Sequence, residues 1–361
     1  MAMTIVLAAG GTGGHIFPAL STALALRERL PECGILWIGT SRSRERELCE
    51  RHGIDLRVLS VNGVAGRGVA AMGAAIARIV KASAEMTLFF LRRRPSAVVA
   101  FGGYVCAPVL SAALLVRIPY YLNEQNTVPG RVNRLFAFGA RCCFLGLPLS
   151  ARWRLAGKSR ITGMPVRPAA ASYDGSGYPA GFVCGATTVL ICGGSQGAQS
   201  MNRCLIEPAR RWAASGMQII WQTGIAGFQE IQTEMKRFPQ VFVADLIDDL
   251  YPYYAAATVM IGRAGASTLA EAALFGLPCI VVPLPWSADN HQWMNAALVK
   301  DQGWGVRIKQ DAHTGDAVDR ALERILENRG QRETMRRKAL ECAPAQAALK
   351  IAEHLAKDLK S

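Results

Sequence analysis

The sequence predicts an α/β protein of two lobes, each a parallel sheet covered by helices. Short apolar runs alternate with helical patterns along the chain, which is typical of parallel sheets covered on both faces. Two of these runs end in a glycine-rich turn, at 10–15 and at 193–198. The 361 residues are more than one hydrophobic core usually serves. Together these observations indicate two α/β domains that carry the same loop.

Seven short apolar runs are expected to be strands. They cover residues 5–9, 35–38, 97–101, 189–192, 218–221, 258–261 and 279–282.

Residues 95–116 form an uncharged stretch of 22 residues, long enough to cross a membrane. Gly102, Gly103 and Pro108 interrupt it, so a strand, a loop and a helix are expected there and no membrane span.

The domain boundary is expected within residues 164–181, which are rich in proline, glycine and serine. This gives a first domain over 1–163 and a second over 164–340. A last helix, over about 341–361, is expected to pack back on the first lobe. Its apolar face holds Ala348, Leu349, Ala352, Leu355 and Leu359.

Both glycine-rich turns lead from a strand into a helix, so backbone N–H groups at the positive end of that helix can hold an anion, most simply a diphosphate. Neither turn is the dinucleotide fingerprint. The first has Ile16 where that pattern needs glycine, and the run 35–38 is followed by Gly39 and Thr40 rather than by an acid for a ribose. Hydride transfer is therefore not predicted.

The net charge of +14 is concentrated in the first half of the chain. Residues 1–163 contain 21 Lys and Arg against 8 Asp and Glu, whereas residues 164–361 contain 20 against 19. The first half is expected to attract nucleic acid, anionic lipid or a phosphorylated substrate.

The chain has ten cysteines and no C-x-x-C pair, which favours reduced thiols in a cytosolic protein over a zinc site or disulfide bonds. The N-terminus is not expected to be a signal peptide.

A candidate ligand site follows the run 258–261. A turn of glycine, serine and threonine opens a helix there, and Glu271 follows within it. Ligands gather at the carboxyl ends of parallel strands, and a carboxylate at that edge can accept hydrogen bonds from two ribose hydroxyls. In the alternative interpretation Ser267 or Thr268 caps the helix, and Glu271 is a first-turn acid that complements the helix dipole.

A second polar cluster follows the run 279–282. Two prolines precede a helix start that carries His291, Gln292 and Asn295 on one face. Each amide offers both a donor and an acceptor, so Gln292 and Asn295 suit sugar hydroxyls.

These segments resemble the GT-B glycosyltransferases that use a UDP-sugar. The resemblance rests on the paired glycine-rich loops, on residues 265–271 and on Gln292 with Asn295. More narrowly, several segments are similar to motifs of the MurG family in the same order, namely residues 10–19, 101–105, 124–126, 165–167 and 193–198. Enzymes of that family add N-acetylglucosamine to the undecaprenyl-pyrophosphoryl-muramoyl-peptide lipid of peptidoglycan synthesis.

The resemblance implies two Rossmann-like lobes with parallel sheets facing across a cleft, and an inverting transfer without metal, cofactor or covalent intermediate. For UDP-N-acetylglucosamine it implies Thr12, Gly13, Gly14, Asn126, Arg167, Ser195, Leu246, Ile247, Ala266, Ser267, Thr268, Leu269, Ala270, Glu271, Gln292 and Asn295. Ser195 would contact the diphosphate, Leu246 and Ile247 the uracil, and Glu271 the ribose. For the lipid acceptor it implies the first lobe, with Gly14, His15, Tyr104, Glu124 and Asn126.

An inverting transfer needs a base that takes the proton of the acceptor's 4-hydroxyl. His15 is the first candidate, because histidine titrates near neutral pH, and Glu124 is the second. In the alternative interpretations His15 only hydrogen-bonds phosphate or backbone, and Glu124 only orients loops. The chain departs from the family pattern at Asn123 (usually His), Met164 (usually Asn) and His291 (usually Gln).

The resemblance implies that the protein is peripheral and lies on the cytoplasmic face of the inner membrane. Its implied partners are the lipid acceptor, an anionic membrane surface and other cell-wall synthesis proteins. Docking is expected through residues 64–94. Apolar residues recur there at helical spacing with basic residues nearby: Val69, Met72, Ile76, Ile79, Met86 and Phe90, with Arg67, Arg78, Lys81, Arg92, Arg93 and Arg94. The alternative is that this stripe is a core face.

Two other enzymes of the GT-B group remain alternatives: a UDP-sugar transferase acting on diacylglycerol or a sterol, and a UDP-N-acetylglucosamine 2-epimerase. An epimerase would need carboxylates beside the sugar, where this chain has amides. A basic nucleic-acid-binding protein is the alternative without catalysis, although no interleaved aromatic and basic pattern points to one, and no nucleic-acid partner is expected.

Overall fold

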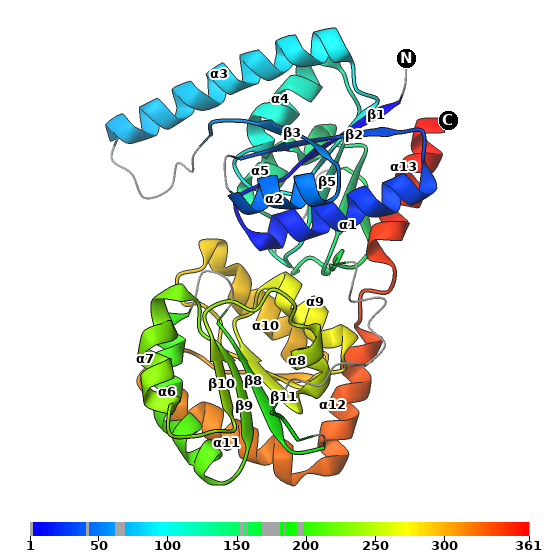
Figure 1. Ribbon diagram of the computed structural model, residues 1–361. Helices are drawn as coiled ribbons and strands as arrows, with labels where there is room; N and C mark the ends of the chain where they lie inside the picture. The colour runs from blue at the N-terminus through cyan, green and yellow to red at the C-terminus, as the bar shows by residue number, and fades with distance from the viewer. Residues whose placement is uncertain are drawn as a thin grey trace. The chain divides into compact units, whose positions relative to one another are not determined.

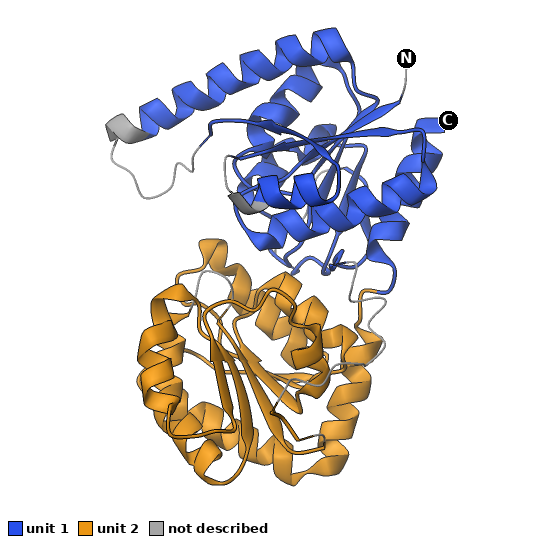
Figure 2. Cartoon of the chain, viewed as in Figure 1, with its two compact units in different colours: residues 1–167, 345–361 blue, residues 168–344 orange. Residues whose placement is uncertain are grey.

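The computed structural model describes residues 3–40, 43–61, 69–151, 155, 157–167, 181–183, 185–193 and 198–360. The chain divides into two compact units (Figure 2). Unit 1 is Met1–Arg167 with Ala345–Ser361, and unit 2 is Pro168–Pro344. Each unit contains one parallel sheet with helices on both of its faces (Figure 1).

The sheet of unit 1 has the order β3-β2-β1-β4-β5-β6-β7, and every neighbouring pair is parallel. Its strands are β1 (Thr4–Ala8), β2 (Gly34–Gly39), β3 (Asp55–Val58), β4 (Ala97–Ala100), β5 (Tyr120–Glu124), β6 (Cys142–Leu145) and β7 (Ser159–Ile161). Alternate residues of β1 enter different cores: Ile5 and Leu7 pack on one face, Val6 and Ala8 on the other. A strand buried on both faces is apolar throughout, which explains the uninterrupted run.

Helices α1 (Gly13–Arg29) and α13 (Ala347–Lys360) cover one face of this sheet, and α3 (Val69–Arg93) and α4 (Cys106–Val116) cover the other. The shorter helices of unit 1 are α2 (Ser43–Arg51), α5 (Arg131–Phe136) and η1 (Ala137–Gly139). The last helix, α13, packs on α1, and Arg29 forms an ion pair with Glu353 at 2.9 Å. The Tyr121 hydroxyl donates to Asp358 of the same helix.

Helix α3 has two apolar faces, and the predicted docking stripe mixed them. Met86 and Phe90 are fully buried in the core beside α4, so that part of the stripe was wrong. Over the part of α3 whose side chains the structure describes, residues 72–93, the large apolar residues that are exposed are Met72, Ile76, Val80, Leu88 and Leu91. Arg67 and the side chain of Val69 lie outside the described residues.

No helix in the described ranges is long and apolar enough to span a membrane. The uncharged stretch 95–116 folds as β4, a turn and α4, as predicted.

The sheet of unit 2 has the order β10-β9-β8-β11-β12-β13 and is also entirely parallel. Its strands are β8 (Thr188–Cys192), β9 (Gln218–Gln222), β10 (Val241–Ala244), β11 (Val259–Gly262), β12 (Cys279–Val281) and β13 (Gly305–Arg307). Its helices are α6 (Gln199–Ala214), α7 (Ile225–Met235), α8 (Tyr251–Ala256), α9 (Ala266–Leu274), η3 (Ala288–Asn290), α10 (His291–Asp301), α11 (Thr314–Glu327) and α12 (Arg329–Glu341). One core packs α6, α7 and α11 on the sheet, and the other packs α8, α9 and α10.

Candidate active site

The first glycine loop, residues 10–14, connects β1 to α1 and is held by a carboxylate from another element. Gly11 has a φ of +96°, a conformation that glycine adopts easily. Its N–H donates to Glu45 Oε1 at 3.0 Å. Glu45, on α2, is fully buried and accepts two more hydrogen bonds from Thr40, at 2.6 Å each. The loop was expected to turn its N–H groups toward an external anion, but that of Gly11 faces the protein's own carboxylate.

His15 lies in the first turn of α1, after Gly13 and Gly14. Its Nδ1 is 3.3 Å from the carbonyl oxygen of Gly10 and 3.4 Å from Oγ1 of Thr12. Gly102 packs beside the ring, because a Cβ there would lie 3.0 Å from Cδ2 and Nε2 of His15. A bond from Nδ1–H to a carbonyl selects the neutral tautomer in which Nε2 is the basic nitrogen.

Glu124 and Asn126, at the end of β5, belong to a compact group of hydrogen bonds. One oxygen of Glu124 accepts from N and Nδ2 of Asn126, at 2.9 and 3.4 Å. The other accepts from the N–H of Gly130 and from Nδ2 of Asn133, at 2.8 Å each. Glu124 is buried, which raises the pKa of its carboxyl group, while these hydrogen bonds lower it. The geometry favours the loop-orienting interpretation of Glu124.

The other residues implied for unit 1 lie nearby in the fold. The Tyr104 side chain is exposed in the turn after β4. The Arg167 guanidinium lies over the ring of Phe17, 5.1 Å from its centre, so the end of this unit packs beside α1. Two of the departures from the family pattern are buried: Asn123 accepts a hydrogen bond from a neighbouring glutamine at 3.0 Å, and Met164 is packed in the interior.

In unit 2 the second glycine loop connects β8 to α6. Residues 194–197, and with them the implied diphosphate ligand Ser195, lie outside the described residues. The loop begins at Gly193, whose N–H donates to the carbonyl of Gln222 at 2.9 Å. A Cβ at Gly193 would lie 3.0 Å from that same oxygen, so the close approach of the two strand ends favours glycine.

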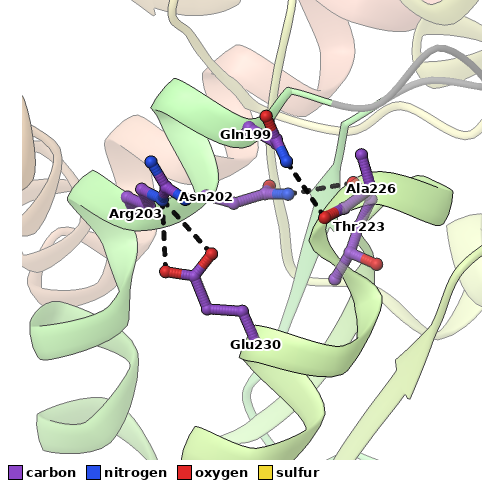
Figure 3. A network of polar contacts seen from close by, with 6 residues as sticks. All are labelled: Gln199, Asn202, Arg203, Thr223, Ala226 and Glu230. Carbon is purple, nitrogen blue, oxygen red and sulfur yellow. Dashed lines mark hydrogen bonds and ion pairs between the residues drawn. The ribbon is translucent and has the colours of Figure 1, made fainter.

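The start of α6 is anchored to the turn that follows β9 and to helix α7 (Figure 3). Nδ2 of Asn202 donates to the carbonyl of Thr223 at 2.9 Å. Gln199 donates to the carbonyl of Ala226 at 3.0 Å. An Arg203–Glu230 ion pair, at 3.2 Å, adds a contact at the surface. These bonds hold the helix whose N-terminus follows the second glycine loop.

Helix α9 begins after the turn that follows β11. Its N-cap is Gly265, without a side-chain cap, and no acid lies in its first turn. The alternative in which Ser267 or Thr268 caps the helix and Glu271 is a first-turn acid is therefore wrong. Oγ of Ser267 is buried and makes no hydrogen bond to any described residue. An unpaired buried hydroxyl is costly, so a ligand atom that pairs with it gains free energy. The implied residues Ala266, Leu269 and Ala270 are buried.

Glu271 is buried in α9 and is oriented by a tyrosine from α8. Its Oε2 accepts a hydrogen bond from the hydroxyl of Tyr254 at 3.2 Å. Tyr254 is itself buried, between Phe275 and the sheet. No sequence motif indicated Tyr254, because a tyrosine in an apolar helix is ordinarily a core residue.

The two implied uracil contacts lie in the loop between β10 and α8. The N–H of Ile247 donates to Oε1 of Gln222 at 3.2 Å, which places this loop beside the end of β9. The N–H of Leu246 donates to the side chain of Asp245 at 2.7 Å, and the Leu246 side chain is exposed.

The amides of α10 connect the loops around them. Oε1 of Gln292 accepts from the N–H of Leu284 at 3.0 Å, and Nδ2 of Asn295 donates to the carbonyl of Ala264 at 3.0 Å. His291 lies at the helix start, with Nδ1 2.8 Å from a backbone carbonyl of η3. Asn295 thus joins the two polar clusters that the sequence indicated separately.

Arg263, at the end of β11, is a buried cation that no motif indicated. It donates to the carbonyls of Val282 and Pro283 at 2.9 and 3.3 Å, to Gln310 at 2.6 Å and to Ser200 at 3.1 Å. All four partners are neutral. Burial lowers the pKa of the guanidinium to about 10, so it stays charged at neutral pH. One side chain therefore connects α6, the end of β11 and the loop after β12.

Both units match domains of one known family. Residues 5–145 match the glycosyltransferase family 28 N-terminal domain, and residues 188–356 match its C-terminal domain. A UDP-N-acetylglucosamine--N-acetylmuramyl-(pentapeptide) pyrophosphoryl-undecaprenol N-acetylglucosamine transferase from Desulfotalea psychrophila is 36% identical, over 96% of this chain and 94% of its own. A protein of the same name from Moorella thermoacetica is 34% identical, over 92% and 93%.

Solved structures agree with these matches. The crystal structure of Acinetobacter baumannii MurG has a TM-score of 0.77 at 28% identity and covers 99% of this chain and 100% of that one. A UDP-N-acetylglucosamine 2-epimerase structure has a TM-score of 0.67 at 14% identity, over 99% and 97%, which shows a shared fold alone. The predicted two-lobe GT-B fold is confirmed, and the chain belongs to the MurG family within glycosyltransferase family 28.

Proposed function

We propose that this chain transfers N-acetylglucosamine from UDP-N-acetylglucosamine to the 4-hydroxyl of the muramoyl sugar in undecaprenyl-pyrophosphoryl-N-acetylmuramoyl-pentapeptide. This step converts lipid I to lipid II in peptidoglycan synthesis. The observation that carries the proposal is the set of transferases of that name, matched at 30% identity or more over nearly the full length of both chains. The reaction is an inverting hexosyl transfer.

Unit 2 is the proposed donor lobe. The diphosphate would lie at the N-terminal ends of α6 and α9, whose dipoles favour an anion. Arg263 adds a buried positive charge among the same strand ends, and the unpaired Ser267 hydroxyl supplies a donor. Glu271, oriented by Tyr254, would accept the ribose hydroxyls.

Gln292 and Asn295 would face the transferred sugar. Because Oε1 of Gln292 already accepts from Leu284, its Nε2 is the atom that would donate to a sugar hydroxyl. Leu246 and Ile247 would contact the uracil, at the far end of the same nucleotide from the sugar.

The chemistry requires one proton transfer and one displacement. His15 Nε2 would take the proton of the acceptor's 4-hydroxyl, and the hydroxyl oxygen would attack C1 of the sugar. The bond from C1 to the diphosphate oxygen breaks, and UDP leaves with the electron pair. Glu124 would hold Asn126 beside the acceptor, and Thr12 with Gly14 would shape the loop that carries His15.

A transfer assay tests the function. Radiolabelled UDP-N-acetylglucosamine is incubated with the full chain and, in separate arms, with the muramoyl lipid, with diacylglycerol and without acceptor. Label should enter only the muramoyl lipid. Label in diacylglycerol would identify the alternative transferase, and UDP-N-acetylmannosamine formed without acceptor would identify the epimerase; either result overturns the proposal.

We also propose that the protein is peripheral and lies on the cytoplasmic face of the membrane, because the proposed acceptor is anchored there by its lipid tail. Other cell-wall synthesis proteins are its proposed neighbours. The exposed face of α3 is the proposed docking surface, defined by Met72, Ile76, Val80, Leu88 and Leu91. Basic residues border it: Lys81, Arg92 and Arg93 are exposed on α3, and Arg94 is exposed directly after its end. An amphipathic surface of this kind binds at the boundary between headgroups and acyl chains.

Neutralising Arg92, Arg93 and Arg94 together is expected to weaken vesicle binding by about 3 kcal/mol, since each basic residue near an anionic surface contributes about 1 kcal/mol. Arg94 has a φ of +40°, so asparagine is the suitable replacement there and glutamine at the other two. Co-sedimentation with vesicles of graded anionic-lipid content and salt measures the effect. The matched control replaces three exposed arginines of unit 2, Arg320, Arg329 and Arg336. Equal binding by both triple variants would rule out this surface.

A further inference from the structure

The peptide bond between Gly10 and Gly11 has both of its polar groups engaged by ionisable side chains. Its N–H donates to Glu45 Oε1 at 3.0 Å, and its carbonyl oxygen lies 3.3 Å from Nδ1 of His15. One peptide group therefore stands between a buried carboxylate and the imidazole proposed as the base. This juxtaposition belongs to neither side chain's sequence motif, since Glu45 lies on α2 and His15 on α1.

The residues around Glu45 leave space for its carboxylate and donate hydrogen bonds to it. A Cβ at Gly39 would lie 2.4 Å from Oε2 of Glu45, and one at Gly10 would lie 2.9 Å from the Thr40 methyl group and 3.3 Å from Oε1. Two elements thus have glycine where they approach the carboxylate. With donors from Gly11 and from both the N–H and hydroxyl of Thr40, a charged carboxylate is compensated although it is fully buried.

We propose that Glu45 is a positioning residue for His15, acting through the Gly10–Gly11 peptide. A carboxylate that accepts from the N–H polarises the peptide group, and hydrogen bonds in such a chain strengthen one another. The Gly10 carbonyl becomes a stronger acceptor for Nδ1–H. This holds the tautomer in which Nε2 is basic and stabilises the imidazolium formed when Nε2 takes a proton. The inference rests on the role of His15 in the proposed function.

Other ionisable groups come from the elements packed around α1. Tyr104 and Cys106 follow β4, Glu124 ends β5, Arg167 lies over Phe17 of α1, and Glu353, His354 and Asp358 lie on α13. Burial raises the pKa of Cys106 to about 12, so its thiol stays neutral. Glu124 is committed to its own loop by four hydrogen bonds. Glu45 is the carboxylate in this set that is linked to His15 through a single peptide group.

The test replaces Glu45 with glutamine, which keeps the size and removes the charge. The acidic limb of the kcat profile is expected to move to lower pH by about one pH unit, because the imidazolium loses a nearby negative charge. At neutral pH kcat should fall about tenfold, because one pKa unit corresponds to about a factor of ten in the basicity of the imidazole. The KM for UDP-N-acetylglucosamine should change much less than kcat, since the residues proposed to contact the uracil, the ribose and the diphosphate lie in unit 2. Glu47→Gln, an exposed acid of the same helix, is the matched control.

A second readout does not depend on turnover. Nitrogen NMR of ¹⁵N-histidine-labelled protein, with His15 assigned by its absence in His15→Ala, reports the tautomer and the titration of each of the five histidines. Glu45→Gln should shift the His15 titration to lower pH and mix its tautomers, while Glu45→Asp, which keeps the charge, should restore most of both. An unchanged His15 titration in Glu45→Gln overturns the inference. If Glu45→Gln fails to fold, the tautomer of His15 in the wild-type protein decides: a neutral ring protonated on Nδ1 supports the linkage to the Gly10 carbonyl, and a ring protonated on Nε2 overturns it. Retention of the acidic limb in His15→Ala instead refutes the proposed base alone.

Discussion

His15→Ala is expected to lower kcat by about a hundred- to ten-thousandfold, the range that general acid–base catalysis contributes. The physical reason is the geometry of the ring. Nδ1 is directed to the Gly10 carbonyl, which makes Nε2 the basic nitrogen that would take the proton of the acceptor's hydroxyl. The acidic limb of the pH–rate profile should disappear with the imidazole. The KM for UDP-N-acetylglucosamine should change much less than kcat, because the residues proposed to contact the uracil, the ribose and the diphosphate belong to unit 2.

Two further variants make this result specific. His313→Ala removes an exposed histidine from unit 2 and should behave as the wild type. Glu124→Gln should retain the acidic limb, because the carboxylate is occupied by Asn126, Gly130 and Asn133. If the limb persists in His15→Ala and is lost in Glu124→Gln, the base is Glu124 and the assignment of His15 is wrong.

The strands that apolar runs predicted are those buried on both faces. β1, β4 and β8 are apolar apart from the threonine that begins β1 and β8, and their runs match the strands to within a residue or so. β3 was not predicted, because it carries Asp55 and Arg57 at the sheet edge and is only partly buried. β5 was also missed, since it ends in Asn123 and Glu124, which are buried at the site rather than in an apolar core.

Helix α3 shows what periodicity cannot separate. Its apolar residues occupy two faces of the helix. The predicted stripe selected apolar residues at three- and four-residue spacing, and this spacing includes residues from both faces. Packing on α4 decides between them: Met86 and Phe90 enter the core, whereas Met72 and Ile76 remain exposed. The sequence could predict an amphipathic helix here but not which apolar residues the fold would bury.

The site residues found from sequence belong to short motifs, whereas the supporting residues do not. Each supporting residue forms its hydrogen bond with a residue distant in the sequence. Glu45 and Gly11 are 34 residues apart, Tyr254 and Glu271 are 17 apart, and Arg263 and Ser200 are 63 apart. A lone glutamate in a helix with many charges, or a tyrosine in an apolar one, has no pattern that separates it from surface or core. Only the fold brings these side chains to the residues that they orient.

Glu271→Ala is expected to raise the KM for UDP-N-acetylglucosamine about ten- to a hundredfold with little change in kcat. A hydrogen bond to a charged group is worth roughly 1.5–3 kcal/mol, and contact with a ribose is felt equally in the ground and transition states. Initial rates with varied donor at saturating acceptor measure the two constants. A sharp fall in kcat with an unchanged KM would instead place Glu271 in the chemistry.

Tyr254→Phe separates ribose binding from a general loosening of the α8–α9 pair. The phenyl ring keeps the stacking on Phe275 and removes only the hydroxyl that donates to Glu271. Because one neutral-donor hydrogen bond is worth about 1 kcal/mol, the donor KM should rise roughly fivefold and the thermal midpoint should move by only a few degrees. In the double variant Glu271→Ala/Tyr254→Phe the loss of the hydroxyl should have no further effect on KM, if the contribution of Tyr254 to donor binding passes through Glu271. Additive effects of the two substitutions would mean that Tyr254 contributes to donor binding independently of the carboxylate, and its orienting role would be withdrawn.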